Sequence, residues 1–258
     1  MSLPAILAAA RPIEGGFSTA IPEAWMQGRT SYGGLSSALA LAAAQGLAED
    51  FPPLRSATVN FVGPLAGEVS VTARLLRRGR NASWVSAEVA SEAGVGLTAT
   101  FVFMGPVDSA LHLNELPAPA GLIPVDGAIP LPESAGPGFT RHFERRWGLP
   151  RSEDKRPELL WWVRAKDSAG LDPMVSLMLI ADALPPGVMP LMTKWSPVSS
   201  MTWLVNLLTP QPQSRNGWFL LRAAGNYAEN GCSSQDMAIW NADGAPIAAG
   251  MQAIALFG

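Results

Sequence analysis

The sequence predicts an α+β fold made of two tandem copies of one plan, in which an antiparallel sheet wraps a central helix. Three observations support this prediction. Each half contains one helix that is almost free of charge, each helix is followed by short strand-like runs with no further helix, and both halves keep the same order. Of 258 residues, 48% are hydrophobic and 15% are charged, where a typical soluble domain has about 25% charged residues. This composition provides a large core and excludes bulk disorder.

The first half begins with a strand expected within residues 15–25. A buried helix follows at 33–49, where GGLSSALALAAAQGLAE is rich in Ala and Leu. Strand-like runs rich in Val, Thr and Phe then follow, separated by glycine-containing turns, at 55–62, 68–77, 83–91 and 97–104. Four strands without an intervening helix indicate an antiparallel sheet packed on the one helix.

The second half repeats this order. A strand is expected at 159–166 and a helix at 172–184, which Asp172 opens as N-cap with Pro173 in the first turn, and which Pro185 and Pro186 end. Further strand-like runs lie at 199–208, 217–225, 233–240 and 247–257. An Asp243-Gly244 turn joins the last two.

The two repeats are expected at 1–107 and 159–258, with a connector at 108–158. Residues 106–157 hold nine of the 23 prolines and show no sustained periodicity. Within the connector, RHFERRW at 141–147 reads either as an interaction segment or as an amphipathic helical turn, and its His142 receives no role.

Charge and composition exclude several function classes. The net charge is −3 and the 18 basic residues are dispersed, so we expect no nucleic-acid partner. No apolar run reaches the ~20 residues of a membrane helix. The single cysteine, Cys232, is expected to be a packed small residue in a reducing, cytoplasmic compartment. His112 and His142 are the only histidines, which makes a histidine-based metal site hard to build. We expect no metal and no cofactor.

Five segments, in order along the chain, resemble those of bacterial acyl-CoA thioesterase II and its relatives. They are YGG at 32–34, RGRNASW at 78–84, WVRA at 162–165, LIAD at 179–182, and the hairpin from Asp243-Gly244 to Gln252. The resemblance covers both halves. It implies a double hotdog fold and hydrolysis of an acyl-CoA thioester.

Asp182 is the first candidate catalytic residue. It lies in the last turn of an apolar helix, where both the apolar setting and the negative end of the helix dipole raise the pKa of a carboxyl group. A carboxylate tuned in this way can act as a general base near neutral pH. The alternative is an aspartate that faces solvent or bonds a loop amide. The resemblance places the family's catalytic aspartate here.

Gln252 is the second candidate. It is the only polar side chain on its face of an apolar strand, so its amide needs partners and could hold a water molecule. The alternative is a bond to the backbone at a bulge near Gly250. The resemblance places the family's catalytic glutamine here.

The third group is a serine or threonine in the family, and four hydroxyl residues compete for this place. They are Ser196, Ser199, Ser200 and Thr202. The position that matches the family's hydroxyl residue is Pro197. Because strand alternation puts Ser199 on the same face as Pro197, we predict Ser199.

These residues predict direct attack by water on the thioester carbonyl, without an acyl-enzyme. The N–H groups of Gly33 and Gly34, which open the first helix, are suited to bind the oxyanion; the alternative for them is a tight turn or close helix packing. No Gly-x-Ser-x-Gly nucleophile elbow occurs.

A dense basic cluster is the candidate for CoA phosphates. Arg77, Arg78 and Arg80 lie at a strand end and turn, and the alternative is a solvated turn. The chain departs from the family at Gly63, where relatives carry arginine, and at Leu35, where glutamine is usual. Both departures remove polar groups from the expected ligand channel.

Two other functions stay open from the sequence. One is an acyl-thioester-binding protein without turnover. The other is an enoyl-thioester hydratase, which normally needs an Asp–His or Glu–His pair. The apolar surplus further predicts a homo-oligomer.

Overall fold

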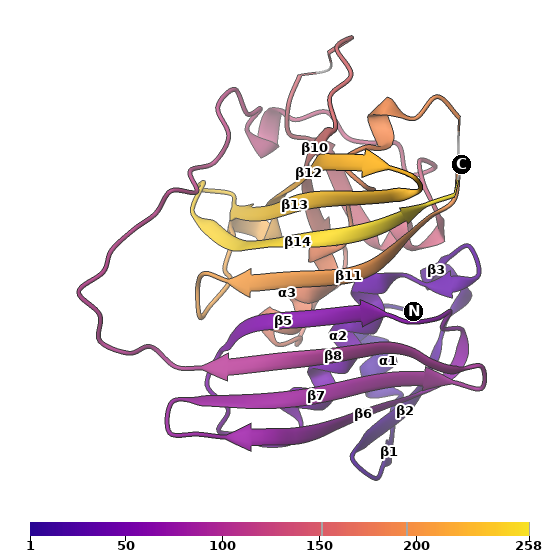
Figure 1. The fold of residues 1–258 in the computed structure, drawn as a ribbon, viewed down its shortest axis with the longest axis vertical. Coiled ribbons are helices and arrows are strands. Elements are labelled where there is room, and N and C mark those ends of the chain that lie inside the picture. Colours follow the sequence, from indigo (N-terminus) through magenta and orange to yellow (C-terminus); the bar gives the residue numbers. More distant parts are fainter. Residues whose placement is uncertain (151, 195, 258) are drawn as a thin grey trace.

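The described residues form one large antiparallel sheet that curls around two central helices (Figure 1). The computed structural model describes residues 1–150, 152–194 and 196–257. The helices are α1 (Leu3–Ala8), α2 (Gly33–Gln45) and α3 (Pro173–Ala181). The N-terminal strands are β1 (Arg11–Ile13), β2 (Gly16–Ile21), β5 (Leu54–Phe61), β6 (Gly67–Arg78), β7 (Ala82–Ser91) and β8 (Gly94–Met104), and a separate small hairpin joins β3 (Met26–Gln27) to β4 (Thr30–Ser31). The C-terminal strands are β9 (Phe143–Trp147), β10 (Glu158–Ala165), β11 (Val198–Leu207), β12 (Phe219–Glu229), β13 (Cys232–Asn241) and β14 (Pro246–Leu256).

The strand order shows the internal duplication. In the described part of the chain it runs β1-β2-β6-β7-β8-β5-β11-β14-β13-β12-β10-β9. The second half mirrors the first, with β2 corresponding to β10, β5 to β11 and β8 to β14. The two half-sheets meet where β5 pairs with β11. The predicted double hotdog fold is therefore confirmed, with its two sheets joined edge to edge.

The two central helices pack against each other in opposite directions. Near one end, the Tyr32 hydroxyl before α2 donates to the Leu179 carbonyl of α3 at 2.8 Å. At the other end, Gln45 Nε2 donates to Asp172 Oδ1 at 3.0 Å. The start of α2 consequently lies beside the end of α3. Asp182, the first candidate catalytic residue, therefore lies between the two repeats.

The connector differs from the prediction in one segment. Residues 143–147 form β9, which pairs with β10, because alternate residues of this segment can face the apolar core; Phe143 and Arg145 are buried. A helical turn therefore does not describe these five residues, and the expected boundary at 159 leaves out one strand of the C-terminal sheet. The indole N–H groups of Trp162 and Trp240 donate to connector carbonyls at 2.8 Å and 3.0 Å, which fastens the connector onto the outer face of that sheet.

Two further observations concern single features. Cys232 is exposed at the start of β13, so the expectation that it is packed is wrong. None of the helices in the described ranges is long and apolar enough to cross a membrane.

Candidate active site

Asp182 lies at the junction of the two repeats. It is the C-cap of α3, which ends there, and its carboxylate accepts the N–H of Gly34 at the start of α2. Its Oδ1 also accepts from Gln252 Nε2 at 3.0 Å. The aspartate therefore neither points freely into solvent nor bonds a loop; it joins α3, α2 and β14.

Burial controls the ionisation of Asp182. Removal of water from the carboxylate raises its pKa to about 7, against the hydrogen bonds from Gln252 and the Gly34 N–H, which lower it. The positive end of α2 opposes the effect of the negative end of α3 on this carboxylate. Tyr32 is the titratable neighbour; burial and then the charge of Asp182 raise its pKa, so it stays neutral. Asp182 retains some solvent access, and a base with this pKa is half ionised near neutral pH.

Gln252 connects Asp182 to a hydroxyl group. It is buried on β14, and its Nε2 donates to Asp182 and, at 2.9 Å, to Ser200 Oγ. Both N–H bonds of the amide are thus used. Gln252 bonds side chains rather than the backbone near Gly250.

The structure brings Ser200 into this cluster in place of the predicted Ser199. Simple alternation along β11 would put Ser199 on the inner face with Trp203, which is buried. A β-bulge between Ser200 and Thr202 inserts one extra residue, and this reverses which side chains face inward. Ser199 is exposed, and its hydroxyl donates to the Ser200 carbonyl at 3.4 Å.

Sequence reasoning missed a second buried glutamine, Gln235 on β13. It lies directly across from Gln252 in the β13–β14 pairing. Its Nε2 donates to Gln252 Oε1 at 2.9 Å, and its Oε1 accepts from the Gly187 N–H at 2.8 Å. The sequence offered only a weak signal, because the buried face of β13 also carries the polar Ser233, two residues before Gln235.

At positions 33 and 34 neighbouring atoms come so close to the backbone that only glycine fits. A Cβ on Gly33 would lie 2.6 Å from Asp182 Oδ2, and one on Gly34 would lie 2.6 Å from the Leu179 carbonyl. The close-packing alternative therefore applies to both residues. The Gly34 N–H bonds Asp182, whereas the Gly33 N–H takes part in none of the described backbone hydrogen bonds outside the helices and strands.

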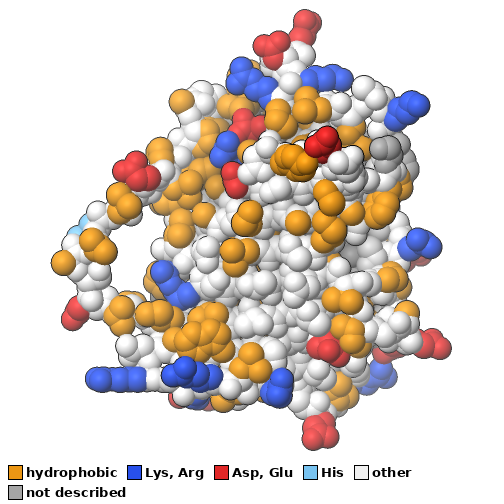
Figure 2. Space-filling view, viewed as in Figure 1, with side chains coloured by type: hydrophobic (Ala, Val, Ile, Leu, Met, Phe, Trp, Pro, Cys, Tyr) orange, Lys and Arg blue, Asp and Glu red, His pale blue; other side chains and the backbone are white. Residues whose placement is uncertain are grey.

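The structure does not bring the arginine cluster to this site. The β6–β7 turn holding Arg77, Arg78 and Arg80 lies at the end of the sheet where β5 begins, whereas the site lies where β5 ends at Phe61. Along β5 this is a separation of roughly 20 Å. Arg78 pairs with Asp50 at 2.5 Å. Figure 2 shows basic side chains gathered at the edge of the molecule where this hairpin lies in Figure 1.

This turn also forms one wall of an open pocket. Arg78, Arg80 and Asn81 line it, and its volume is about 340 Å³. Phosphate binding by these arginines stays a prediction. Within one chain their distance from the site does not support it.

The polar cluster occurs once in the duplicated fold. The buried residues of β8, which corresponds to β14, are all apolar: Gly96, Leu97, Ala99, Phe101 and Phe103. At the end of the helix pair opposite to the cluster, the Asp172 side chain caps the first N–H groups of α3, those of Met174 and Val175. Within the described residues, the second repeat carries the hydrogen-bonded pair of carboxylate and amide, Asp182 and Gln252.

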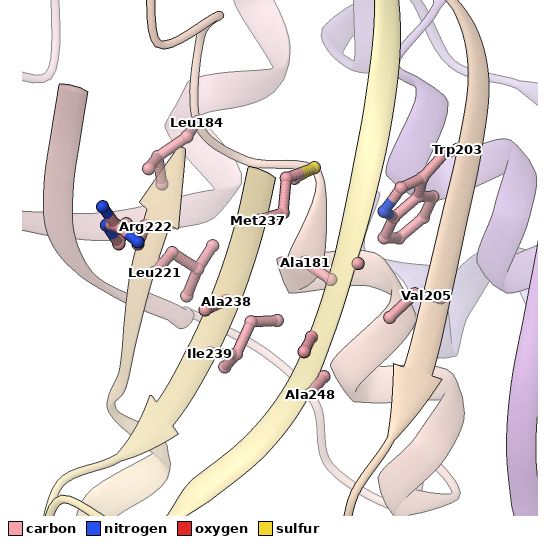
Figure 3. Close-up of a pocket in the computed structure, with 12 residues that line it drawn as sticks. Ala181, Leu184, Trp203, Val205, Leu221, Arg222, Met237, Ala238, Ile239 and Ala248 are labelled. Atoms are coloured by element: carbon pink, nitrogen blue, oxygen red, sulfur yellow. The ribbon is translucent and has the colours of Figure 1, made fainter. Parts of the chain in front are cut away.

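The surroundings of the cluster are apolar and close-packed. Ala181 and Leu184, on either side of Asp182, line a cavity of about 10 Å³ beneath β11–β14, together with Trp203 (Figure 3). Such a volume holds about one water molecule. The chain neighbours of Asp182, namely Ala181, Ala183 and Leu184, are all buried, which limits the access of bulk water to the carboxylate.

Neither histidine contacts Asp182. His142 stacks on Trp25 with ring centroids 3.8 Å apart, and His112 is exposed in the connector. Among the described residues, no group of three His, Cys, Asp or Glu side chains could hold a metal ion.

One sheet that surrounds two central helices is the architecture of a double-hotdog protein. The chain belongs to the acyl-CoA thioesterase family. Residues 21–104 match the acyl-CoA thioesterase N-terminal domain, and residues 114–256 match the C-terminal domain. The expected family is thereby confirmed, and membership of this family supports thioesterase activity in general terms.

Solved structures share this fold. A hot dog fold protein of unknown function from Alicyclobacillus acidocaldarius has a TM-score of 0.87 at 19% identity, over 100% of this chain and 99% of that chain. An acyl-CoA thioesterase II from Mycobacterium marinum has a TM-score of 0.77 at 15% identity, and the match covers 100% of this chain and 99% of that chain. A TesB protein from Mycobacterium avium has a TM-score of 0.73 at 17% identity and covers both chains fully. No curated protein sequence matches the chain.

Proposed function

We propose that the protein hydrolyses an acyl-CoA thioester to a free acid and CoA by direct attack of water. The observation that supports this proposal is the Gln252 amide, which holds Asp182 and Ser200 from one nitrogen atom. Because both oxygens lie within 3.0 Å of that nitrogen, one water molecule can contact both. The Ser200 hydroxyl accepts from Gln252, so its own proton is available to the water.

The reaction follows from these contacts. Ser200 donates a hydrogen bond to the water oxygen. Ionised Asp182 takes a proton from this water while the water oxygen forms a bond to the thioester carbonyl carbon. The carbonyl oxygen becomes an oxyanion, and the Gly33 N–H at the start of α2 is the donor suited to stabilise it. When the C–S bond breaks, the proton on Asp182 passes to the leaving thiolate, and the carboxylate is restored.

A panel of acyl-CoA substrates of increasing chain length tests this function. Wild type should release free thiol from at least one chain length, and Asp182→Asn should lower kcat by roughly 100-fold or more, because the general base is lost. Asp172→Asn is the matched control, since Asp172 caps the opposite end of α3 and asparagine caps equally well. Absence of hydrolysis on every chain length, or full activity of Asp182→Asn, would overturn the proposal.

Two alternatives are outcomes of the same assay. A binding protein without turnover would retain acyl-CoA, measured by titration calorimetry, and release no thiol. An enoyl-thioester hydratase would hydrate an enoyl-CoA; the separation of both histidines from Asp182 speaks against it.

A cytoplasmic location stays a prediction from the single cysteine.

A further inference from the structure

We propose that Gln235 is a positioning residue that sets the orientation of the Gln252 amide and thereby directs both of its N–H bonds toward Asp182 and Ser200. The catalytic part of this inference rests on the proposed function. The orientation itself rests only on hydrogen-bond geometry.

The orientation begins at a group with one possible role. The backbone N–H of Gly187 can only donate, so the side-chain atom of Gln235 that meets it at 2.8 Å must be the oxygen. The nitrogen of Gln235 then faces Gln252, which must present its own oxygen at 2.9 Å. This leaves the nitrogen of Gln252 toward Asp182 and Ser200. Each glutamine therefore has one orientation that satisfies all partners.

Residues 187 and 188 of the α3–β11 connection lie close against β12. A Cβ on Gly187 would lie 2.7 Å from the Ala223 carbonyl, and one on Gly225 would lie 2.4 Å from Val188. Only glycines at 187 and 225 allow this approach of the connection to β12. Gly187 follows Asp182 by five residues, so the same short segment carries the carboxylate and fixes the amide that bonds it.

Burial makes the orientation energetically decisive. Gln235 is 1% exposed and Gln252 is 4% exposed, so water cannot replace a lost partner without cost. If the Gln252 amide turned over, its oxygen would face the Asp182 carboxylate and disfavour ionisation. Its oxygen would also require the Ser200 proton, which would then be unavailable to the attacking water.

Gln235→Met tests the inference, because methionine has a similar volume and cannot form either hydrogen bond. We expect a fall in kcat of roughly tenfold. We also expect the rise of kcat/KM with pH to move to higher pH, because Asp182 loses a donor that stabilises its anion. Tyr32, whose pKa is raised by burial and by the charge of Asp182, stays neutral in this range.

Ser233→Ala is the matched control. Ser233 lies on the same face of β13 as Gln235, is 3% exposed, and its hydroxyl has no hydrogen-bond partner in the described structure. Its pH profile should match that of wild type. A role of Gln235 in packing alone would lower stability and leave the pH profile of the folded enzyme unchanged, which would overturn the inference.

Gln235→Glu provides a second test if the methionine variant does not fold. The new side chain can still accept from Gly187. Once ionised it has no proton to donate, so Gln252 must turn its nitrogen toward it and away from Asp182. We expect the rate of this variant to fall at alkaline pH, where wild type reaches its plateau. A profile identical to that of wild type would contradict the inference.

A readout without substrate separates this inference from the proposed function. Because the pKa of Asp182 is higher in the folded than in the unfolded protein, wild type should lose stability as pH rises from 5 to 8. In Gln235→Met, a further rise in this pKa should enlarge that loss, which urea denaturation measures. If wild type hydrolyses no thioester but this enlarged loss occurs, the proposed function fails and the orientation of Gln252 by Gln235 stands. If wild type is active and the loss is unchanged, the inference on Gln235 fails alone.

Discussion

Removal of the Asp182 carboxyl group should change how the stability of the protein depends on pH. In the folded protein the pKa of Asp182 is about 7, whereas its ordinary value is 3.8. The folded state therefore holds this proton more tightly than the unfolded state. The resulting stability is fully present below the ordinary pKa and is lost as pH rises through 7.

The size of this effect follows from the shift. At ~1.4 kcal/mol per pKa unit, the loss amounts to roughly 4 kcal/mol in total, of which roughly 3 kcal/mol falls between pH 5 and pH 8. Asp182→Asn has no such proton to lose. Relative to wild type, this variant should therefore gain roughly 3 kcal/mol of unfolding free energy between pH 5 and pH 8.

Urea denaturation of wild type and Asp182→Asn at pH 5, 6, 7 and 8 measures this difference. Subtraction of the two curves removes the contributions of groups common to both proteins, such as the exposed pair of Asp50 and Arg78. Asp172→Asn serves as control, and its difference from wild type should stay level over this range. A pH-independent difference for Asp182→Asn would refute the reasoning that burial holds this carboxyl group protonated up to neutral pH.

Four further outcomes are expected. Ser200→Ala should lower kcat by about tenfold or more, because the donor to the attacking water is lost, while Ser199→Ala should retain the wild-type rate; the reverse order in a thiol-release assay would contradict the assignment. Gly33→Ala should abolish hydrolysis, since its Cβ would lie 2.6 Å from the catalytic carboxylate, whereas Gly105→Ala, with 3.7 Å to its nearest neighbour, should remain active. Trp203→Ala should lower the unfolding free energy by about 3–5 kcal/mol, because the side chain is 1% exposed; a loss below about 1 kcal/mol by urea denaturation would show that the site collapses. Light scattering should give a mass above that of one 27.2 kDa chain, and a mass equal to one chain would exclude the expected homo-oligomer.

Local sequence determined the two central helices, most of the strands and their order, but not β9. Glycine and proline mark the ends of both central helices, and short Val- and Thr-rich runs predict the strands within a few residues of their observed bounds. It also singled out Asp182 and Gln252, because an isolated polar residue in an apolar helix or strand requires a partner. These features depend on near neighbours in the chain, which is why a single sequence is enough to predict them.

Tertiary structure alone decided which groups meet. The bulge in β11 selects Ser200 over Ser199, because one extra residue reverses the faces of the strand without leaving a mark in the alternating pattern. The register of β13 against β14 places Gln235 opposite Gln252, and the antiparallel packing of the two helices brings the Gly34 N–H to Asp182. Register and helix packing are set by the total burial of both repeats at once, so no local pattern contains them.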